Sequence, residues 1–160
     1  DQVQTILMMA SMVRDLGGEL LTYTERNRLV SLITDLEAAI QSANKQRISQ
    51  KTEALELYVM NNLQDVLTVC FGMILVANKD STLITEEERK LLATAIAKYM
   101  MCVQEKKDRK SPQCVILYIQ IQVQVGAILS RIQGSSGQVS GGEAPAPANI
   151  LDLLRGDTRS

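Results

Sequence analysis

Apolar residues recur every three or four positions along most of the chain, which is the spacing of one face of an α-helix. The first such segment spans about residues 2–15 and ends at Gly17-Gly18, because glycine readily adopts the left-handed conformation that closes helices. We expect the second segment to begin after Thr24, whose hydroxyl would cap its first turn. The expected buried positions of the two segments are Val3, Ile6, Leu7, Ala10, Val13, Leu29, Leu32, Ile33, Leu36 and Ile40.

The pattern continues after a polar interval. A third segment is predicted over residues 52–77, with a bend or break at Asn61-Asn62 or at Gly72. The fourth has the clearest start, since Thr85 and Glu88 have the spacing of a capping box, in which each side chain satisfies the other's backbone amide. Its expected buried face consists of Leu91, Leu92, Ala95, Tyr99 and Cys102.

The last long segment opens at Ser111-Pro112, and proline is favoured at the first position of a helix. Within it, residues 118–125 alternate Ile or Val with Gln, and such alternation is typical of a β-strand. No obvious partner strand accompanies it in a chain with helical periodicity. We therefore favour a helix that is buried on most sides and keep the strand as the alternative.

Two parts of the chain resemble each other. Residues 3–7 and 63–67 share an apolar pattern 60 positions apart, and each is followed by a turn and a Thr-led acidic helix start, at Thr24 and at Thr85. Repeated helix pairs usually stack or bundle. The sequence thus predicts an all-α helical bundle of five or six helices, built from two related helix pairs and a third, shorter unit.

The predicted bundle occupies residues 1–133. Residues 134–148 are rich in Gly, Ser and Pro and have the composition of a flexible linker. Residues 149–160 are predicted to begin with a short amphipathic helix that docks on a protein partner or on its own bundle. Because the chain begins with Asp1 rather than Met, we expect a processed or excised fragment. The candidate partner-binding residues are Ile150, Leu151, Leu153 and Leu154.

Composition excludes several kinds of function. The 160 residues include no His, which removes His-dependent catalytic triads, His-ligated zinc and imidazole pH switches. A net charge of −1 and 3% aromatic residues argue against a nucleic-acid partner. The chain also lacks a Gly-rich phosphate loop, a Cys-X-X-Cys motif and a nucleophile elbow. We expect no enzyme, no cofactor and no metal site.

The remaining candidate motifs are interpreted structurally. Glu86-Glu87-Glu88 suits a helix start better than a metal site, because adjacent helical carboxylates point in different directions. The charged run 106–110 is expected to be a solvated turn, and Arg155-Gly156-Asp157 a chance occurrence of the integrin-binding tripeptide. The seven Met residues are expected to fill gaps in the core. The apolar run 66–77 is too short to cross a bilayer, so no transmembrane segment is expected.

Three cysteines leave two alternatives open. Cys102 and Cys114 flank a predicted connection between helices, and a disulfide between them would stabilise the fold by about 3 kcal/mol. Cys70 would then be a free, buried thiol. The other interpretation is three unpaired thiols in a reducing compartment.

The recurrent pattern, Leu-Gln-x-x-Leu followed by a turn and then Thr-acidic-x-Arg-x-Leu-Leu, resembles the helical region before the cleavage site of polycystin and sperm-receptor-for-egg-jelly type proteins. It is also similar to the helical half of the autoproteolysis domain of adhesion receptors. The matching stretches are residues 3–7 with 24–33, and 63–67 with 85–96. The family's His-Leu-Ser/Thr cleavage motif is absent, so the resemblance implies the helical support of a cell-surface or ciliary receptor rather than its cleaving part.

We therefore expect a non-catalytic structural or interaction module, extracellular or associated with the ciliary membrane, whose partners are proteins or neighbouring domains. The alternative is a cytoplasmic helical adaptor or regulatory domain that binds a protein through its surface or its tail helix. The two readings differ in the expected cysteine state, since an extracellular module should carry a bond between Cys102 and Cys114.

Overall fold

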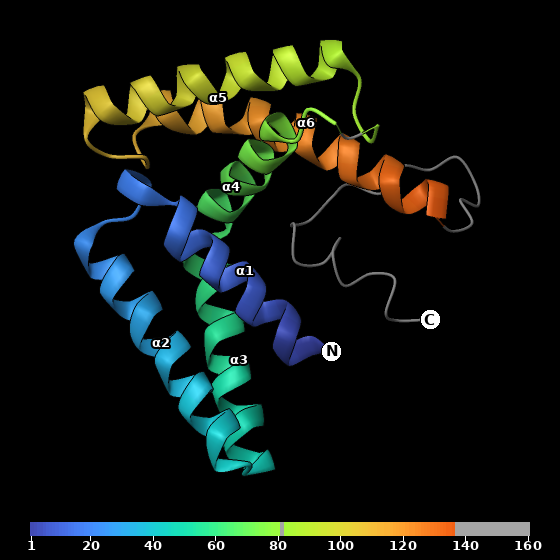
Figure 1. Ribbon diagram of the computed structural model, residues 1–160. Helices are drawn as coiled ribbons and strands as arrows, with labels where there is room; N and C mark the ends of the chain where they lie inside the picture. Colours follow the sequence, from blue (N-terminus) through green and yellow to red (C-terminus); the bar gives the residue numbers. More distant parts are fainter. Residues whose placement is uncertain (81, 137–160) are drawn as a thin grey trace. The chain divides into compact units, whose positions relative to one another are not determined.

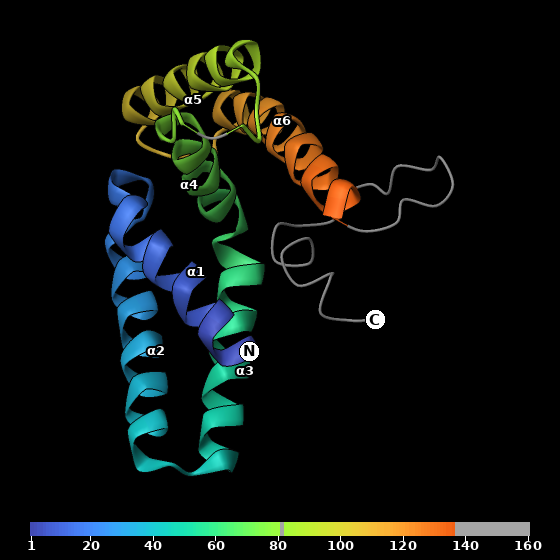
Figure 2. The ribbon, with the colours of Figure 1, turned by 45° about the vertical axis from the view of Figure 1, so that its right-hand side comes forward.

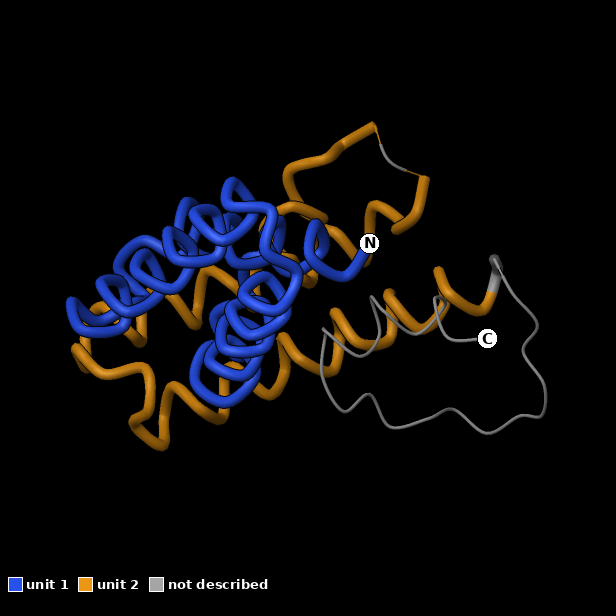
Figure 3. The backbone as a smooth tube through the Cα atoms, turned by 90° about the horizontal axis from the view of Figure 1, so that it is seen from below, with its two compact units in different colours: residues 1–70 blue, residues 71–160 orange. Residues whose placement is uncertain are grey.

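The computed structural model describes residues 1–80 and 82–136, and in this part of the chain every regular element is a helix (Figure 1). The prediction of an all-α helical bundle is therefore confirmed. Contacts divide the chain into two compact units, residues 1–70 and the residues from Phe71 onward (Figure 3). The elements are α1 (Gln2–Leu16), a 3₁₀ turn (Gly18–Leu20), α2 (Tyr23–Ser42), α3 (Lys45–Asn62), α4 (Gln64–Ala77), α5 (Glu86–Lys106) and α6 (Pro112–Ser136).

The first unit is built on a hairpin of α2 and α3, with α1 packed across both helices (Figures 1 and 2). The hairpin turns at Ala43, which closes α2 in the left-handed conformation, and Asn44 caps α3 by accepting a hydrogen bond from the Arg47 amide. The turn is therefore only two residues long, which holds the two helices side by side. The apolar core of these three helices contains Ile6, Met9, Ala10, Val13, Leu29, Leu32, Ile33, Leu36, Ala39, Leu55 and Val59.

The start of α2 differs from the sequence prediction. The capping residue is Thr22 and not Thr24, because Thr22 forms both hydrogen bonds of a capping box with Glu25. The glutamate three positions after Thr22 was the signal that should have located the helix start. Tyr23 is the first helical residue, and it is 81% exposed.

The break predicted in the third segment lies at Asn61-Asn62 and not at Gly72. α3 ends at Asn62 and α4 begins at Gln64, with an angle of 86° between the two helices and a fully buried Leu63 at the corner. Gly72 does not bend α4. A Cβ atom there would lie only 3.1 Å from Ile96 Cδ1 and 3.3 Å from Val125 Cγ2, so this glycine permits close packing of α4.

α3 also starts earlier than predicted. Residues 45–51 are helical although all of them except Ile48 are polar, since the Asn44 cap and the contacts of α3 with α2 compensate for the missing apolar face. A search for apolar periodicity alone therefore places the helix start about two turns too late.

The second unit contains an antiparallel pair formed by α5 and α6 (Figure 1). The predicted capping box between Thr85 and Glu88 is present in full, and Glu88 also forms an ion pair with Arg131 of α6. The predicted buried face of α5 is right at Leu92 and Tyr99 but wrong at Leu91, which is 58% exposed. The ion pair and the core of α5 together hold the two helices against each other.

α6 is helical through residues 118–125, which confirms the favoured interpretation over the strand. The expectation that it is buried on most sides is wrong, because Ile119 and Val123 are 49% and 62% exposed. α6 continues to Ser136, three residues into the predicted linker.

Candidate interaction surface

Because residues 118–125 are helical, their alternation of apolar and polar residues places apolar side chains on two opposite faces of α6. Successive residues of a helix are rotated by about 100°, so positions two apart point in nearly opposite directions. Ile121 and Val125 are fully buried, whereas Ile119 and Val123 are exposed. Alternating Ile and Val therefore give α6 two apolar faces, one in the core and one in solvent.

The solvent-facing row consists of Ile116, Ile119 and Val123, which we call the α6 stripe. Their side chains are 68%, 49% and 62% exposed. Spacings of three and four residues place them in one line along the helix, and the exposed Ala127 continues that line by one more turn. Contiguous apolar patches on protein surfaces often mark interaction sites, so the α6 stripe is a candidate interaction surface.

Within α6 itself, the flanks of the α6 stripe carry no charge. No Asp, Glu, Lys or Arg occurs between Lys110 and Arg131, and Gln113 and Gln120 are the exposed polar neighbours. Amide side chains offer both hydrogen-bond donors and acceptors, so this face does not select a partner by charge sign.

α6 is also long and apolar enough to cross a bilayer. Residues 112–134 have a mean hydropathy of 1.5 in their most apolar window, with 28% of that window buried, and the bent pair α3–α4 passes the same test when its two helices are taken together. These features rest on length and composition, and the core helix of a water-soluble bundle shares them. The sequence prediction considered only residues 66–77 and missed α6, because its glutamines interrupt the apolar run.

The two cysteines for which the sequence left open a disulfide or free thiols lie close together. Cys102 lies near the end of α5 and Cys114 in the first turn of α6, and their sulfur atoms are 3.2 Å apart. The structure holds both as free thiols, together with Cys70. The sequence placed the connection between the two helices in the interval from Cys102 to Cys114. The actual connection is shorter, because α5 continues to Lys106 and the chain turns at Lys107.

The thiol environments differ. The pKa of Cys102 is raised, chiefly by its hydrogen bond with the Cys114 thiol and then by partial loss of water contact. Burial raises the pKa of the Cys70 thiol to about 12. Cys70 is therefore an unreactive core residue, since a thiol must ionise before it reacts.

The first unit has a cleft between the start of α1 and α3. This cleft has a volume of about 510 Å³, and its floor includes Thr52, whose buried hydroxyl finds no hydrogen-bond partner among the described residues. The carboxylates of Asp1, which caps α1, and of Glu53 and Glu56 in α3 line it, and Glu56 accepts a hydrogen bond from Gln2. No group of three or more His, Cys, Asp or Glu side chains within the described ranges is placed to hold a metal ion. The polar residues around the cleft are Asp1, Gln2, Lys45, Ser49, Thr52, Glu53 and Glu56.

The structure places the other candidate motifs as follows. Glu86 to Glu88 form the first turn of α5, where Glu88 has the predicted capping role. The charged run 106–110 covers the end of α5 and the turn after it. The tail candidates and the Arg155-Gly156-Asp157 tripeptide lie outside the described residues; these candidates are Ile150, Leu151, Leu153 and Leu154.

Comparisons of the chain with family models, with curated proteins and with solved structures find no match. The interpretation of the chain therefore rests on its own residues and their geometry.

Proposed function

We propose that this chain is a non-catalytic helical interaction module, and that the α6 stripe receives an amphipathic helix from a partner protein or from a neighbouring domain. The observation that carries the proposal is the solvent exposure of Ile116, Ile119 and Val123 in one line on a helix whose opposite face is buried. No catalytic role is assigned, since the shifted pKa values of Glu88 and Cys70 have structural causes, an ion pair and burial.

The shape of the α6 stripe favours a helical occupant. Ile116, Ile119 and Val123 have the spacing of a and d positions in a heptad, which is the seam that one helix presents to another. From Ile116 to Ala127 the line extends about 16 Å, at 1.5 Å per residue. The matching segment is therefore a helix of about three turns with its own apolar stripe and with uncharged polar flanks.

The size of the α6 stripe constrains how it binds. Burying the exposed parts of three aliphatic side chains contributes roughly 3 kcal/mol, at about 25 cal/mol for each Å². This is too little to offset the loss of translational freedom between two separate proteins. The occupant is therefore tethered nearby, as a neighbouring domain would be, or makes additional contacts outside the α6 stripe.

We also propose that the two units are structural repeats, in which α2 and α5 correspond. Both helices open with a capping box and close with a left-handed residue, Ala43 in α2 and Lys107 in α5. Five pairs of residues 63 positions apart support the correspondence: Thr22 and Thr85, Glu25 and Glu88, Arg26 and Arg89, Leu29 and Leu92, and Ile33 and Ile96. The four apolar members of these pairs are all buried.

The resemblance to polycystin-type receptors suggests a setting for the module, as a helical support between domains of a cell-surface or ciliary receptor. The alternative is an intracellular adaptor. The state of Cys102 and Cys114 in protein from its native source, trapped with acid before alkylation, separates the two settings. A complete bond supports the receptor setting, and two free thiols support the intracellular one.

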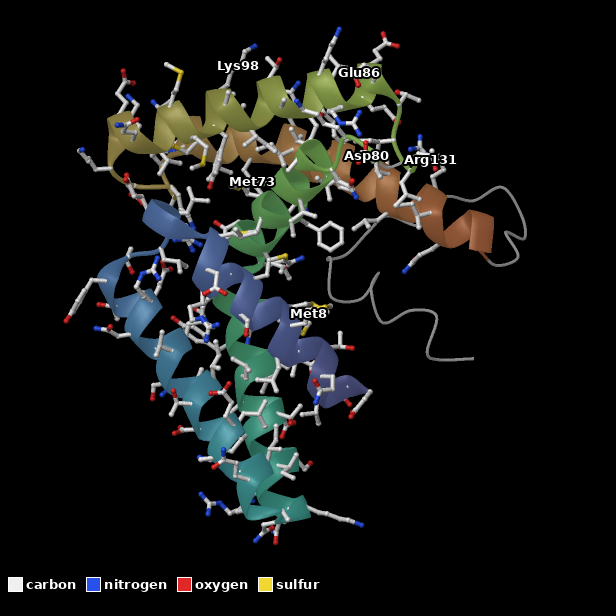
Figure 4. The ribbon with its side chains drawn as sticks, in the orientation of Figure 1. Met8, Met73, Asp80, Glu86, Lys98 and Arg131 are labelled. Atoms are coloured by element: carbon white, nitrogen blue, oxygen red, sulfur yellow. The ribbon has the colours of Figure 1, made fainter. Side chains whose placement is uncertain are left out.

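The interaction itself is tested by photo-cross-linking in the native cells. Ile119 is replaced by benzoylphenylalanine, and the cross-linked peptides are identified by mass spectrometry. The matched control carries the same group at Lys98, which points away from α6 on the outer side of α5 (Figure 4). We expect a cross-link from position 119 to an amphipathic helix of another protein or domain, which disappears when Ile116 and Val123 are both changed to Glu.

Three results would overturn the proposal. Cross-links confined to residues 150–154 of the same chain would make the α6 stripe an internal docking site for the tail. Cross-links to a second copy would make it a self-association surface, and cross-links to lipid would make it a membrane contact. Labelling at position 119 no stronger than at position 98 would leave it without an occupant.

A further inference from the structure

The sulfur atoms of Cys102 and Cys114 lie 3.2 Å apart. The two residues belong to different helices and are brought together by the packing of α5 on α6. A disulfide is about 2.05 Å long, so the sulfur atoms need to move only about 1 Å closer to bond. The helix pair therefore already holds the two thiols close to a bonded arrangement.

The two thiols differ in access to solvent. Cys114 is fully buried, whereas Cys102 is partly exposed. A dissolved oxidant therefore reaches the sulfur of Cys102 first, and Cys114 is reached only through Cys102. This is the arrangement of an attacking thiol with a resolving thiol behind it.

We propose that Cys102 and Cys114 form a reversible redox site, in which Cys102 reacts with a small disulfide such as oxidised glutathione and Cys114 completes an intramolecular bond. In the first step the Cys102 thiolate attacks one sulfur of the glutathione disulfide. A bond forms between Cys102 and one glutathione, the glutathione S–S bond breaks, and the released glutathione thiolate takes up a proton.

In the second step Cys114 loses its proton and its sulfur attacks Cys102. The bond between Cys102 and glutathione breaks, and the second glutathione leaves as a thiol. The two protein thiols are oxidised by two electrons in total, and one glutathione disulfide is reduced to two glutathione molecules. Excess reduced glutathione reverses both steps, so the bonded fraction follows the ratio of the two forms.

The raised pKa of Cys102 sets the rate of the first step. Less of the reactive thiolate is present at neutral pH than for an unperturbed cysteine, so the reaction is slow there and accelerates as the pH rises. The bond would close the turn around Lys107 and fix the end of α5 to the start of α6. The α6 stripe lies on residues outside the bonded pair, so this inference is independent of the proposed interaction.

Cys70 offers a matched internal control. It is fully buried, and its pKa of about 12 makes it a poor nucleophile. Trypsin also separates the three cysteines, since cleavage after Lys and Arg places them in residues 52–79, 99–106 and 111–131. A bond between any two of them is therefore visible as a specific pair of linked peptides.

The experiment equilibrates the full chain in buffers of graded oxidised and reduced glutathione, followed by acid trapping, alkylation and mass spectrometry. We expect linked peptides 99–106 and 111–131 in the wild type and in Cys70→Ser. We expect Cys114→Ser to accumulate one glutathione on Cys102, and Cys102→Ser to leave Cys114 unmodified. The oxidised wild type should melt about 5 °C or more above the reduced form, whereas Cys102→Ser should melt alike in both buffers.

The proposal is overturned if all three thiols remain alkylatable in excess oxidised glutathione, or if the bond includes Cys70. It is also overturned if Cys114→Ser gains no glutathione on Cys102, or gains it more slowly than Cys102→Ser gains it on Cys114. Should Cys114→Ser fail to fold, Cys114→Ala replaces it, and the linked peptides of the wild type provide a test that needs no variant.

Discussion

Arg26 and Arg89 have the same relationship to the helix that precedes each of them. Each directly follows the glutamate of a capping box, and each donates hydrogen bonds to carbonyl oxygens at the end of the preceding helix or just after it. Arg26 donates to the Arg14 and Gly18 carbonyl oxygens at 3.2 and 2.9 Å, and Arg89 to the Asn78 carbonyl oxygen at 2.8 Å. Carbonyl groups at helix ends lack partners within the helix, so these arginines stabilise two helices at once.

The first prediction concerns Arg89, which is only 7% exposed and also forms an ion pair with Glu86. Changing Arg89 to Ala removes a charged hydrogen bond from a largely buried position, and we expect a loss of about 2 kcal/mol in the free energy of unfolding. Urea unfolding followed by circular dichroism measures the loss. The matched control is Lys90→Ala, an exposed neighbour, for which we expect a change below about 0.5 kcal/mol.

The second prediction tests the start of α2. Changing Thr22 to Ala removes the hydroxyl that accepts the Glu25 amide hydrogen bond, and we expect a loss of about 1 kcal/mol. Changing the exposed Thr24 to Ala leaves both bonds of the capping box in place, so stability should be unchanged or slightly higher. Urea unfolding of the two variants side by side decides which threonine caps the helix, and a larger loss for Thr24→Ala would contradict the structure.

The third prediction is a pH dependence at Glu88. Hydrogen bonds from Arg131, and then from the Thr85 backbone, lower the pKa of Glu88 from 4.5 to about 2. Because the pKa is lower in the folded state, the stabilisation is complete above about pH 4.5 and is lost as the pH falls through about 2. A third of the side chain is exposed, so solvent screening limits the effect to about 1 kcal/mol.

The comparison for this pH dependence is Glu88→Gln, which keeps a capping side chain but removes the charge. Its unfolding free energy should change less than that of the wild type between pH 5 and pH 2.5, within the window between the two pKa values. Glu87→Gln removes an exposed carboxylate from the same turn and serves as the matched control. Equal pH dependence in the wild type and in Glu88→Gln would show that the ion pair contributes nothing.

The fourth prediction uses the two faces of α6. Ile121→Ala leaves a cavity in the core and should cost about 3 kcal/mol, since Ile121 is fully buried. Ile119→Ala, two positions away, removes a half-exposed side chain and should cost less than about 1 kcal/mol. Thermal unfolding measures both. The reverse order would mean that α6 is rotated about its axis relative to the structure.

Apolar periodicity and capping motifs were sufficient for the fold class and for most helices. The Thr85 and Glu88 motif located the start of α5 because a capping box is a local feature that a short stretch of sequence contains in full. The start of α2 was misplaced although the same motif is present, because Glu25 was interpreted as the residue that follows a Thr24 cap and not as the third residue after a Thr22 cap.

The candidate surface was less accessible to sequence analysis. Residues 118–125 are apolar at every second position, and nothing local indicates which of these positions face the core. Leu91 shows the same difficulty, since it satisfies helical spacing and yet is exposed. Burial is decided by which neighbouring helix covers a face, and this depends on contacts between residues far apart in the sequence. The closeness of Cys102 and Cys114 was anticipated because the turn between them is short.

The alternating segment of α6 has a consequence for the chain before it folds. Residues 119–125 combine β-branched side chains and glutamines without charge or proline, and such segments readily form intermolecular β-sheets when unprotected. In α6 the backbone N–H and C=O groups of these residues hydrogen-bond within the helix. They are therefore not available to form an intermolecular β-sheet. Formation of α6 thus protects the chain against aggregation through this segment.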